Sequence, residues 1–350
     1  MEMPRFSGRP EADMKDLFEK SSLSIIGLGK NTGKTSFLNE LLEEARIHAK
    51  DKILAITSIG RDGEEKDLVT NSKKPRIYVY EGTLVATSTE LVGRCDITME
   101  ILDVLPLYSA LGRIILLRAL SDGFVEIAGP SRKKDLALLE SAVRRIEPQA
   151  VFLVDGALSR MSFATSTEST VLCTGVNISR SPQKVLEKTV DAVYSLTMKK
   201  TERCLPTEKW RAFIYNGGWE KVEGYLAMEL GKEIIEKYTE KTEAVFLRGA
   251  VTDSLLTKLL SETLFRSVEL ILEDPTKFLV SHEMLQKLSL RKISVTAEHT
   301  VSVERILFNP YETSGLEIPS EELIQLIGKE TALPVVSLKD LQRRRRNEET

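Results

Sequence analysis

Residues 23–36 of the chain read Leu-Ser-Ile-Ile-Gly-Leu-Gly-Lys-Asn-Thr-Gly-Lys-Thr-Ser. The apolar run 23–26 predicts a buried strand that ends at Gly27. From Lys34 onward the apolar residues recur at helical spacing, which predicts a helix directly after the loop. A glycine-rich loop between a buried strand and a helix can bind phosphate groups, because its amides and the positive end of the helix point at the same place. The segment therefore predicts a phosphate-binding loop in an α/β fold.

The residue types in this loop suit a nucleoside triphosphate. Gly29 and Gly33 lack the Cβ that would keep backbone amides away from a phosphate chain. Lys34 would supply an ammonium group to the β- and γ-phosphates, and Thr35 a hydroxyl to Mg²⁺. The predicted nucleotide-binding residues are Gly29, Lys30, Asn31, Thr32, Gly33, Lys34, Thr35 and Ser36. A turn that merely joins strand to helix is the alternative.

The spacing of the glycines departs from the usual P-loop. The place five residues before Gly-Lys-Thr is held by Leu28, and Gly27 lies six residues before it. This longer spacing and the extra Lys30 resemble the branch of P-loop proteins that includes dethiobiotin synthetase, cobyrinate synthetases, cyclic diphosphoglycerate synthetase and the MinD/ParA ATPases. In some of these a lysine reaches the partner's phosphates across a homodimer. Lys30 stands one residue closer to Gly-Lys-Thr than in MinD, so whether it acts in cis or in trans stays open.

Two carboxylates are candidates for the catalytic metal site. Asp155 follows the apolar run 150–154, as a Walker B aspartate follows its strand, and could act on Mg²⁺ directly or through water. Asp62 follows the second predicted strand, at the edge of the sheet where ligands bind in open α/β folds. It would position the attacking water or the metal. A turn aspartate and a solvated acidic loop are the respective alternatives.

Other polar segments also follow predicted strands. Residues 174–177 (Thr-Gly-Val-Asn) lie where base recognition occurs in this class, which makes Asn177 a candidate nucleotide-binding residue; a plain turn is the alternative. Residues 129–134 (Gly-Pro-Ser-Arg-Lys-Lys) and 121–123 (Ser-Asp-Gly) could contact a substrate or partner, although an exposed helix start explains the basic segment as well.

The wider pattern predicts an α/β protein with a doubly wound, mostly parallel P-loop sheet and a second, smaller α/β domain. Apolar strands are predicted at 53–57, 76–80, 114–118, 150–154 and 170–173, and helices around 98–102 and over 131–146. The predicted domains are a polar lead-in (1–20), the nucleotide-binding domain (21–205), a C-terminal α/β domain that holds a partner or substrate (206–340) and a basic tail (341–350).

Composition limits the function classes. With 42% hydrophobic and 29% charged residues among 350, the chain can build ordinary globular cores. The net charge of −3 gives no global attraction to nucleic acid or to anionic membranes, and no apolar run is long enough to cross a bilayer. Three cysteines and three histidines, widely scattered, predict neither a disulfide framework nor a metal cluster. We expect a cytoplasmic protein with neither a nucleic-acid nor a membrane partner.

Several segments together resemble one family. Residues 27–35, 57–64, 118–124, 154–160 and, in the second predicted domain, 249–253 are similar to the ATP-binding subunit of the lysine 5,6-aminomutase reactivase. The resemblance covers most of residues 20–340. It implies an accessory ATPase, with ATP and Mg²⁺ as cofactors, that promotes exchange of damaged cobalamin on a B12-dependent amino-acid aminomutase in amino-acid-fermenting bacteria. Its partners would be lysine 5,6-aminomutase or a related mutase and a second reactivase subunit.

Two other functions are compatible with the same loop. A ligase of the dethiobiotin synthetase type would use ATP to phosphorylate a small carboxylate held by the second domain. A nucleotide-sensing module would bind without useful hydrolysis. For an enzyme, the predicted catalytic residues are Lys34, Asp155 and Asp62, and the predicted metal ligands are Thr35, Asp155 and Asp62.

Overall fold

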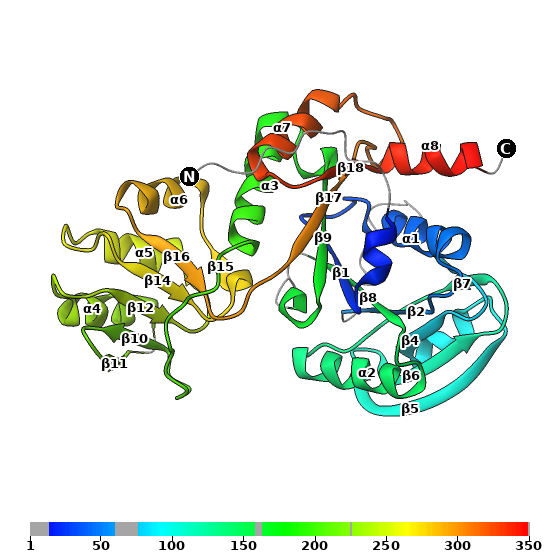
Figure 1. Cartoon of the computed structure of the whole chain (residues 1–350), viewed down its shortest axis with the longest axis horizontal. Helices are drawn as coiled ribbons and strands as arrows, with labels where there is room; N and C mark the ends of the chain where they lie inside the picture. The colour runs from blue at the N-terminus through cyan, green and yellow to red at the C-terminus, as the bar shows by residue number, and fades with distance from the viewer. Residues whose placement is uncertain (1–13, 60–75, 158–162, 225, 349–350) are drawn as a thin grey trace. The chain divides into compact units, whose positions relative to one another are not determined.

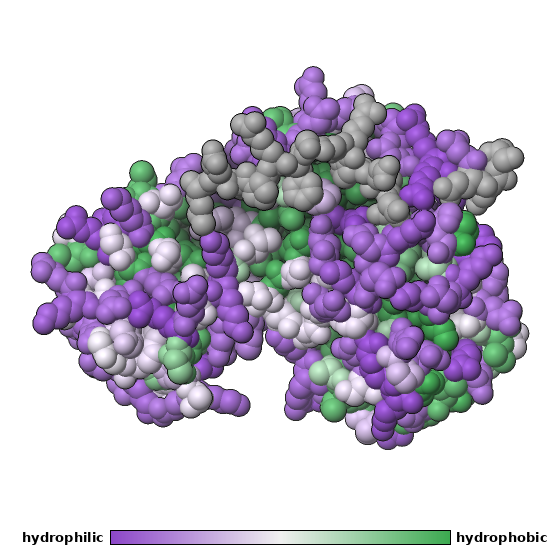
Figure 2. Space-filling view, in the orientation of Figure 1, coloured by the Kyte–Doolittle hydropathy of each residue, from purple (hydrophilic) through white to green (hydrophobic). Residues whose placement is uncertain are grey.

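The computed structural model describes residues 14–59, 76–157, 163–224 and 226–348 (Figure 1). The chain divides into two compact units, Met1–Val190 with Val303–Thr350, and Asp191–Ser302. We call them unit 1 and unit 2. On the face shown in Figure 2, hydrophilic residues predominate and hydrophobic residues are interspersed among them.

Unit 1 is built on a nine-stranded sheet of order β18-β17-β9-β1-β8-β2-β4-β6-β5. Neighbouring strands from β18 to β4 are parallel, and β6 and β5 continue the sheet in antiparallel pairs. A mixed α/β fold with a large, mostly parallel sheet is therefore confirmed. The strands are β1 (Ser22–Gly27), β2 (Leu54–Ser58), β4 (Leu84–Ser88), β5 (Met99–Ser109), β6 (Gly112–Ala119), β8 (Val151–Ala157), β9 (Ser169–Gly175), β17 (Val303–Asn309) and β18 (Val335–Ser337).

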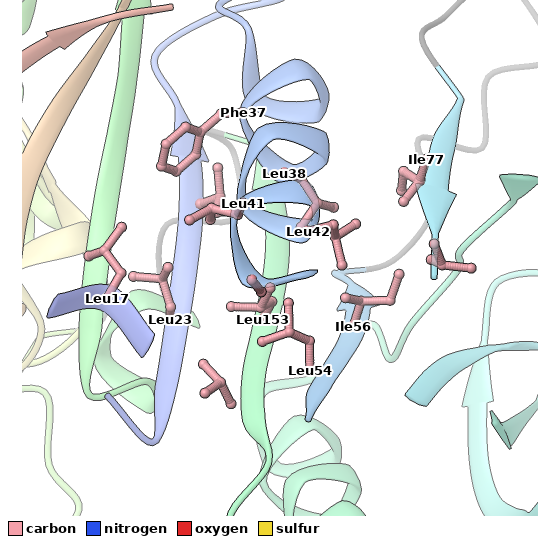
Figure 3. Packing of buried hydrophobic residues seen from close by; sticks show 14 of the residues in the cluster. Leu17, Leu23, Phe37, Leu38, Leu41, Leu42, Leu54, Ile56, Ile77 and Leu153 are labelled. Atoms are coloured by element: carbon pink, nitrogen blue, oxygen red, sulfur yellow. The ribbon is translucent and has the colours of Figure 1, made fainter. Parts of the chain in front are cut away.

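Helices cover both faces of this sheet. Apolar residues of α1 (Lys34–His48), four of which are drawn in Figure 3, pack against alternate residues of β1, β2 and β8. Residues of α2 (Lys133–Ile146) pack against the intervening residues of β2 and β8, so α2 covers the opposite face. The remaining elements of unit 1 are η1 (Lys15–Glu19), β3 (Ile77–Val79), η2 (Thr89–Arg94), β7 (Gly123–Val125), η4 (Val176–Ile178), α7 (Glu321–Thr331) and α8 (Leu338–Glu348). Helix α3 (Pro182–Leu196) begins in unit 1 and ends in unit 2.

Unit 2 has a five-stranded sheet of order β11-β10-β12-β14-β16. Strands β12, β14 and β16 are parallel, and β10 and β11 are antiparallel additions at one edge. Its elements are β10 (Ala212–Tyr215), β11 (Trp219–Val222), α4 (Ala227–Lys237), β12 (Ala244–Leu247), β13 (Val251–Thr252), α5 (Asp253–Leu260), β14 (Glu269–Leu272), η5 (Pro275–Lys277), β15 (Phe278–Leu279), α6 (His282–Leu290) and β16 (Ser294–Ala297). Trp210 and Trp219 pack against the buried cluster of unit 2 that contains Phe213 and Phe246.

The domain boundaries differ from the prediction at both ends of unit 2. The backbone of 199–201 bonds to Ala297 of β16, which places these residues in unit 2 rather than in the predicted domain 21–205. Residues 303–350 return to unit 1, because β17 pairs with β9 and β18 pairs with β17. The predicted C-terminal domain 206–340 is therefore wrong at its end: unit 2 is inserted between two parts of unit 1.

Three local expectations are also wrong. The helix around 98–102 is part of β5, because residues 99–109 form a long hairpin with β6. The lead-in is not wholly polar, since Leu17 and Phe18 are buried against α1 and β1. The strand at 76–80 lies outside the large sheet, since β3 pairs only with β7 among the described residues.

The C-terminal basic run is not a tail. It forms helix α8, in which Arg344 Nη2 lies 3.6 Å from Glu44 Oε1 and Arg345 Nη1 lies 3.3 Å from Glu40 Oε1 of α1. The two glutamates are more than nine-tenths buried, so they favour nearby cations. No helix of the described residues is long and apolar enough to cross a membrane.

Candidate functional site

The loop between β1 and α1 is tightly folded. It spans residues 28–33, and two of them have left-handed backbone conformations: Asn31 with φ 57° and Gly33 with φ 86°. Gly33 is the residue that caps α1, and a Cβ there would lie 3.2 Å from Cβ of Asn309. Because φ near +86° is readily adopted only by glycine, Gly33 is required by the turn into the helix.

The closest approach within the loop is at Gly27. A Cβ at Gly27 would lie 2.7 Å from Nζ of Lys34 and 2.5 Å from Oγ1 of Thr32. Lys34 therefore reaches back across the loop, and Thr32 folds beneath it and donates a hydrogen bond to the carbonyl of Gly29 at 3.2 Å. By contrast, a Cβ at Gly29 would meet only ordinary contacts of 3.7 Å or more. Gly29 and Gly33 were predicted to allow close approach of amides to phosphate, which these contacts do not test, and Gly27 was not singled out from the sequence.

The start of α1 favours an anion. Its hydrogen-bond ladder begins with Phe37 N donating to the carbonyl of Gly33 at 2.8 Å, so the amides before Phe37 lie outside that ladder. The first turn contains no acidic residue, and Lys34, Thr35 and Ser36 are half-buried there. Lys30 is exposed on the loop. The partial positive charge of the helix start is thus reinforced rather than neutralised.

Asp155 lies beside this loop at the carboxyl end of β8. It pairs in register with Ile25 of β1 and with Ser58 of β2. It stands two residues after Leu153, so it lies on the face of the sheet that α1 covers. Burial raises the pKa of the nearby Cys173 thiol; the Lys34 ammonium opposes this rise and the Asp155 carboxylate adds to it. Lys34 of α1 and Asp155 of β8 therefore both lie near enough to Cys173 of β9 to affect its pKa.

Asn177 and Asn309 also meet at the loop. Nδ2 of Asn177 donates to the backbone oxygen of Asn31 at 3.0 Å, and Nδ2 of Asn309 donates to the same oxygen at 2.9 Å. The sequence makes Asn177 a candidate for base recognition, whereas no sequence pattern predicts Asn309 as a site residue. Asn309 ends β17, which the sequence analysis assigned to another domain, so no sequence pattern connected it with the loop.

The other predicted residues have varied placements. Asp62 lies outside the described residues. Gly129 packs on the end of β2, where its amide donates to Oγ of Ser58 at 3.2 Å, and the basic residues 132–134 that follow are exposed at the start of α2. Asp122 accepts a hydrogen bond from the amide of Glu81 at 2.8 Å, so its carboxylate connects two loops of unit 1.

Comparisons of the chain with protein-family models, with curated proteins and with solved structures find no match. The chemistry of the site follows from its own residues. Lys34, Thr35 and the first amides of α1 follow β1, and Asp155 lies toward the carboxyl end of the adjacent parallel strand β8, so these groups lie toward the same edge of the sheet. This set can hold an anionic chain together with a hard divalent cation.

Proposed function

We propose that unit 1 is a P-loop nucleotide-binding domain of the doubly wound class, which binds Mg²⁺ and ATP at residues 27–36 and hydrolyses the nucleotide. The observation that carries this proposal is the placement of Lys34. Its ammonium lies back over the loop, at the start of a fifteen-residue helix with no acidic residue in its first turn. A triphosphate seated there would meet backbone amides and the ammonium together.

The residues at the loop fit Mg²⁺. Magnesium is usually held by one or two protein oxygens, with phosphate oxygens and water completing its octahedral set. Thr35 and Asp155 offer a hydroxyl and a carboxylate oxygen, and they would be its protein ligands. When bound, the metal neutralises charge on the phosphate oxygens.

In the proposed reaction, a water oxygen forms a bond to the γ-phosphorus while the bond to the β–γ bridging oxygen breaks. The products are ADP and inorganic phosphate, and the proton of the water passes to solvent or to phosphate. Lys34 and the amides of the loop stabilise negative charge on the phosphates throughout. Asp62 is the proposed residue for positioning the water.

The proposed biological role is that of an accessory ATPase. The resemblance to the lysine 5,6-aminomutase reactivase supports a cytoplasmic factor that promotes release of damaged cobalamin from an aminomutase. Binding of ATP and of ADP can drive such a release only if the two nucleotides favour different conformations. Unit 2 is the proposed partner surface because it is a separate compact unit inserted into the nucleotide-binding unit.

The proposed nucleotide site is tested by Lys34→Ala. Loss of an ammonium that bonds to phosphates should weaken binding of MgATP about 10- to 100-fold, measured by titration calorimetry. Lys50→Ala is the matched control, because it removes the same charge from an exposed position near the other end of α1. Equal affinity of Lys34→Ala and the unsubstituted protein would refute the site.

The accessory role has its own readout. Phosphate release should rise when an aminomutase loaded with cyanocobalamin is added, and it should not rise with small carboxylates alone. Stimulation by a small carboxylate without any protein partner would instead identify a ligase.

A further inference from the structure

Two asparagine side chains hold one backbone oxygen of the loop. Asn177 and Asn309 each direct Nδ2 at the carbonyl of Asn31, at 3.0 and 2.9 Å. Asn177 lies in η4, directly after β9, and Asn309 is the last residue of β17, so the two come from neighbouring strands of the large sheet. One acceptor thus receives two donors from segments far apart in the sequence.

The two asparagines are themselves fixed. Nδ2 of Asn177 also donates to the carbonyl of Tyr311 at 2.7 Å, and Oδ1 of Asn309 accepts from the amide of Tyr311 at 3.1 Å. Asn309 is 7% exposed, and a Cβ at Gly175 would lie only 2.3 Å from its backbone oxygen. The side-chain amides of Asn177 and Asn309 are therefore held in place by packing and hydrogen bonds outside the loop.

Holding the carbonyl of Asn31 also fixes the next amide. In a trans peptide the carbonyl of one residue and the N–H of the following residue point in opposite directions within one plane. The N–H of Thr32 therefore faces away from Asn177 and Asn309. Asn31 has a left-handed φ of 57°, a conformation that asparagine adopts more readily than most residues other than glycine, and the same two bonds stabilise it.

We propose that Asn177 and Asn309 are positioning residues, which hold loop 28–33 in its phosphate-receiving conformation before the nucleotide arrives. The inference rests on the proposed function. Donors that are already oriented bind an anion without further ordering, so the two asparagines raise affinity through the loop and not by touching phosphate. They belong to the segments that precede and follow unit 2, since β9 and η4 come before its first residue and β17 comes after its last.

This role differs from base recognition by Asn177. The donor group Nδ2 of Asn177 already makes two hydrogen bonds, to Asn31 and to Tyr311. A base-reading role for Nδ2 would require breaking one of them, and only Oδ1 could accept from a base with both bonds intact. The two roles predict different ligand dependence: a base reader affects ATP only, whereas a loop-positioning residue affects any chain of phosphates.

The test uses Asn177→Ala, Asn309→Ala and the double variant in the full chain. Binding of MgATP and of magnesium tripolyphosphate, which has no base, is measured by titration calorimetry. Each single variant should weaken both ligands about 2- to 10-fold, and the double variant about 10- to 100-fold. In steady-state hydrolysis KM should rise while kcat changes little, because the same contacts act in the ground state and in the transition state.

Asn39→Ala is the matched control. Asn39 lies in α1, and its Nδ2 donates to the carbonyl of Arg76 at 3.0 Å, so the variant removes a similar bond without touching the loop. Its affinity for both ligands should equal that of the unsubstituted protein. If an alanine variant does not fold, Asn177→Leu or Asn309→Leu approximately keeps the side-chain size, removes the donor and adds no charge. Unchanged affinity in the double variant, or equal loss in Asn39→Ala, would overturn the proposal.

Two further outcomes separate the inference from the proposed function. Loss of ATP affinity with unchanged tripolyphosphate affinity would assign Asn177 to the base and overturn the positioning role. If the unsubstituted protein binds neither ligand, the proposed function fails. Hydrogen exchange of residues 28–36 without ligand then decides the positioning role alone: faster exchange in the double variant than in Asn39→Ala supports it, and equal exchange refutes it.

Discussion

The segments after β1 and after β12 share several features and differ in the charge at the start of the following helix. Each follows a parallel strand, and each contains a glycine with left-handed φ and a basic residue: Gly33 and Lys34 in unit 1, Gly249 and Arg248 in unit 2. The first turn of α1 has no acidic residue, whereas α5 begins with Asp253. The carboxyl edge of a parallel sheet is thus a place where a ligand can bind, and local charge decides whether an anion is favoured.

The guanidinium group of Arg248, which follows β12, pairs with carboxylates of unit 2. Nη1 of Arg248 lies 3.4 Å from Oε1 of Glu273 and 3.9 Å from Oε2 of Glu298, and Nη2 donates to the carbonyl of Pro206 at 2.9 Å. Glu273 also pairs with Lys277 at 2.8 Å. These bonds tie together the residues that follow β12, β14 and β16, so we interpret this edge as structural and the edge with Lys34 as functional.

The largest expected difference between the two edges concerns their carboxylates. Asp155→Asn should lower kcat for ATP hydrolysis about 10- to 100-fold with a smaller change in ATP affinity, because a metal ligand is weakened while Lys34 and the loop remain. Glu273→Gln should leave kcat unchanged. Phosphate release and titration calorimetry on both variants provide the measurement. Full activity of Asp155→Asn would remove this residue from the metal site and weaken the contrast between the edges.

The next largest effect is expected on folding stability when the glycines with left-handed φ, Gly33 and Gly249, are replaced. Gly33→Ala and Gly249→Ala each place alanine at a φ of 86° or 90°, which costs about 1–2 kcal/mol of folding free energy. At Gly33 the new Cβ also lies 3.2 Å from Asn309, whereas nothing lies within 4 Å at Gly249. Gly33→Ala should therefore be the more destabilising by about 1 kcal/mol.

Differential scanning calorimetry measures both glycine variants, and calorimetric titration of MgATP tests the loop. Only Gly33→Ala should lose nucleotide affinity, since only this glycine belongs to the proposed site. Equal destabilisation would mean that Asn309 moves aside at no cost, and lost affinity in Gly249→Ala would contradict the division between the two edges.

The smallest expected effect is on the acid stability of unit 2. Burial alone would raise the pKa of Glu273, but the hydrogen bond from Lys277 and the charges of Lys277 and Arg248 outweigh burial and hold it below its usual 4.5. Because this pKa is lower in the folded than in the unfolded state, its stabilisation is present above the unfolded pKa and is lost as pH falls through the folded one. The free energy of unfolding should therefore fall less steeply with acid in Glu273→Gln.

Tryptophan fluorescence follows this transition selectively. Trp210 and Trp219 are the two tryptophans of the chain, and both lie in unit 2. Urea titrations from about pH 6 down to about pH 3.5 give the slopes for the variant and the unsubstituted protein. Equal slopes would show that Glu273 carries no charge-dependent stability.

The sequence predicted the local structure around Lys34 better than it predicted the domain boundaries. The strand, loop and helix around Lys34 follow one another directly in the sequence, so the pattern of neighbouring residues is enough to predict them. Asp155 was recognisable because a long apolar strand precedes it. Asn309 was not, because its role depends on pairing between β17 and β9, whose residues are more than a hundred positions apart.

Local patterns also misled in particular places. Residues 98–102 contain polar and apolar residues at spacings that fit a helix, and only the hairpin partner β6 makes them a strand. The arginine run at 343–346 has the composition of a solvated tail. In the structure, two of its arginines pair with the buried glutamates of α1. In both cases the deciding partner is remote in the chain.

The sequence by itself determined the loop, since backbone freedom at glycine, charge at Lys34 and helical periodicity are properties of neighbouring residues. The tertiary structure alone decided that unit 2 is an insertion and that the chain after it returns to hold Asn31. Strand pairing and side-chain donors act through space, and an apolar strand is compatible with several neighbours until the whole sheet has formed.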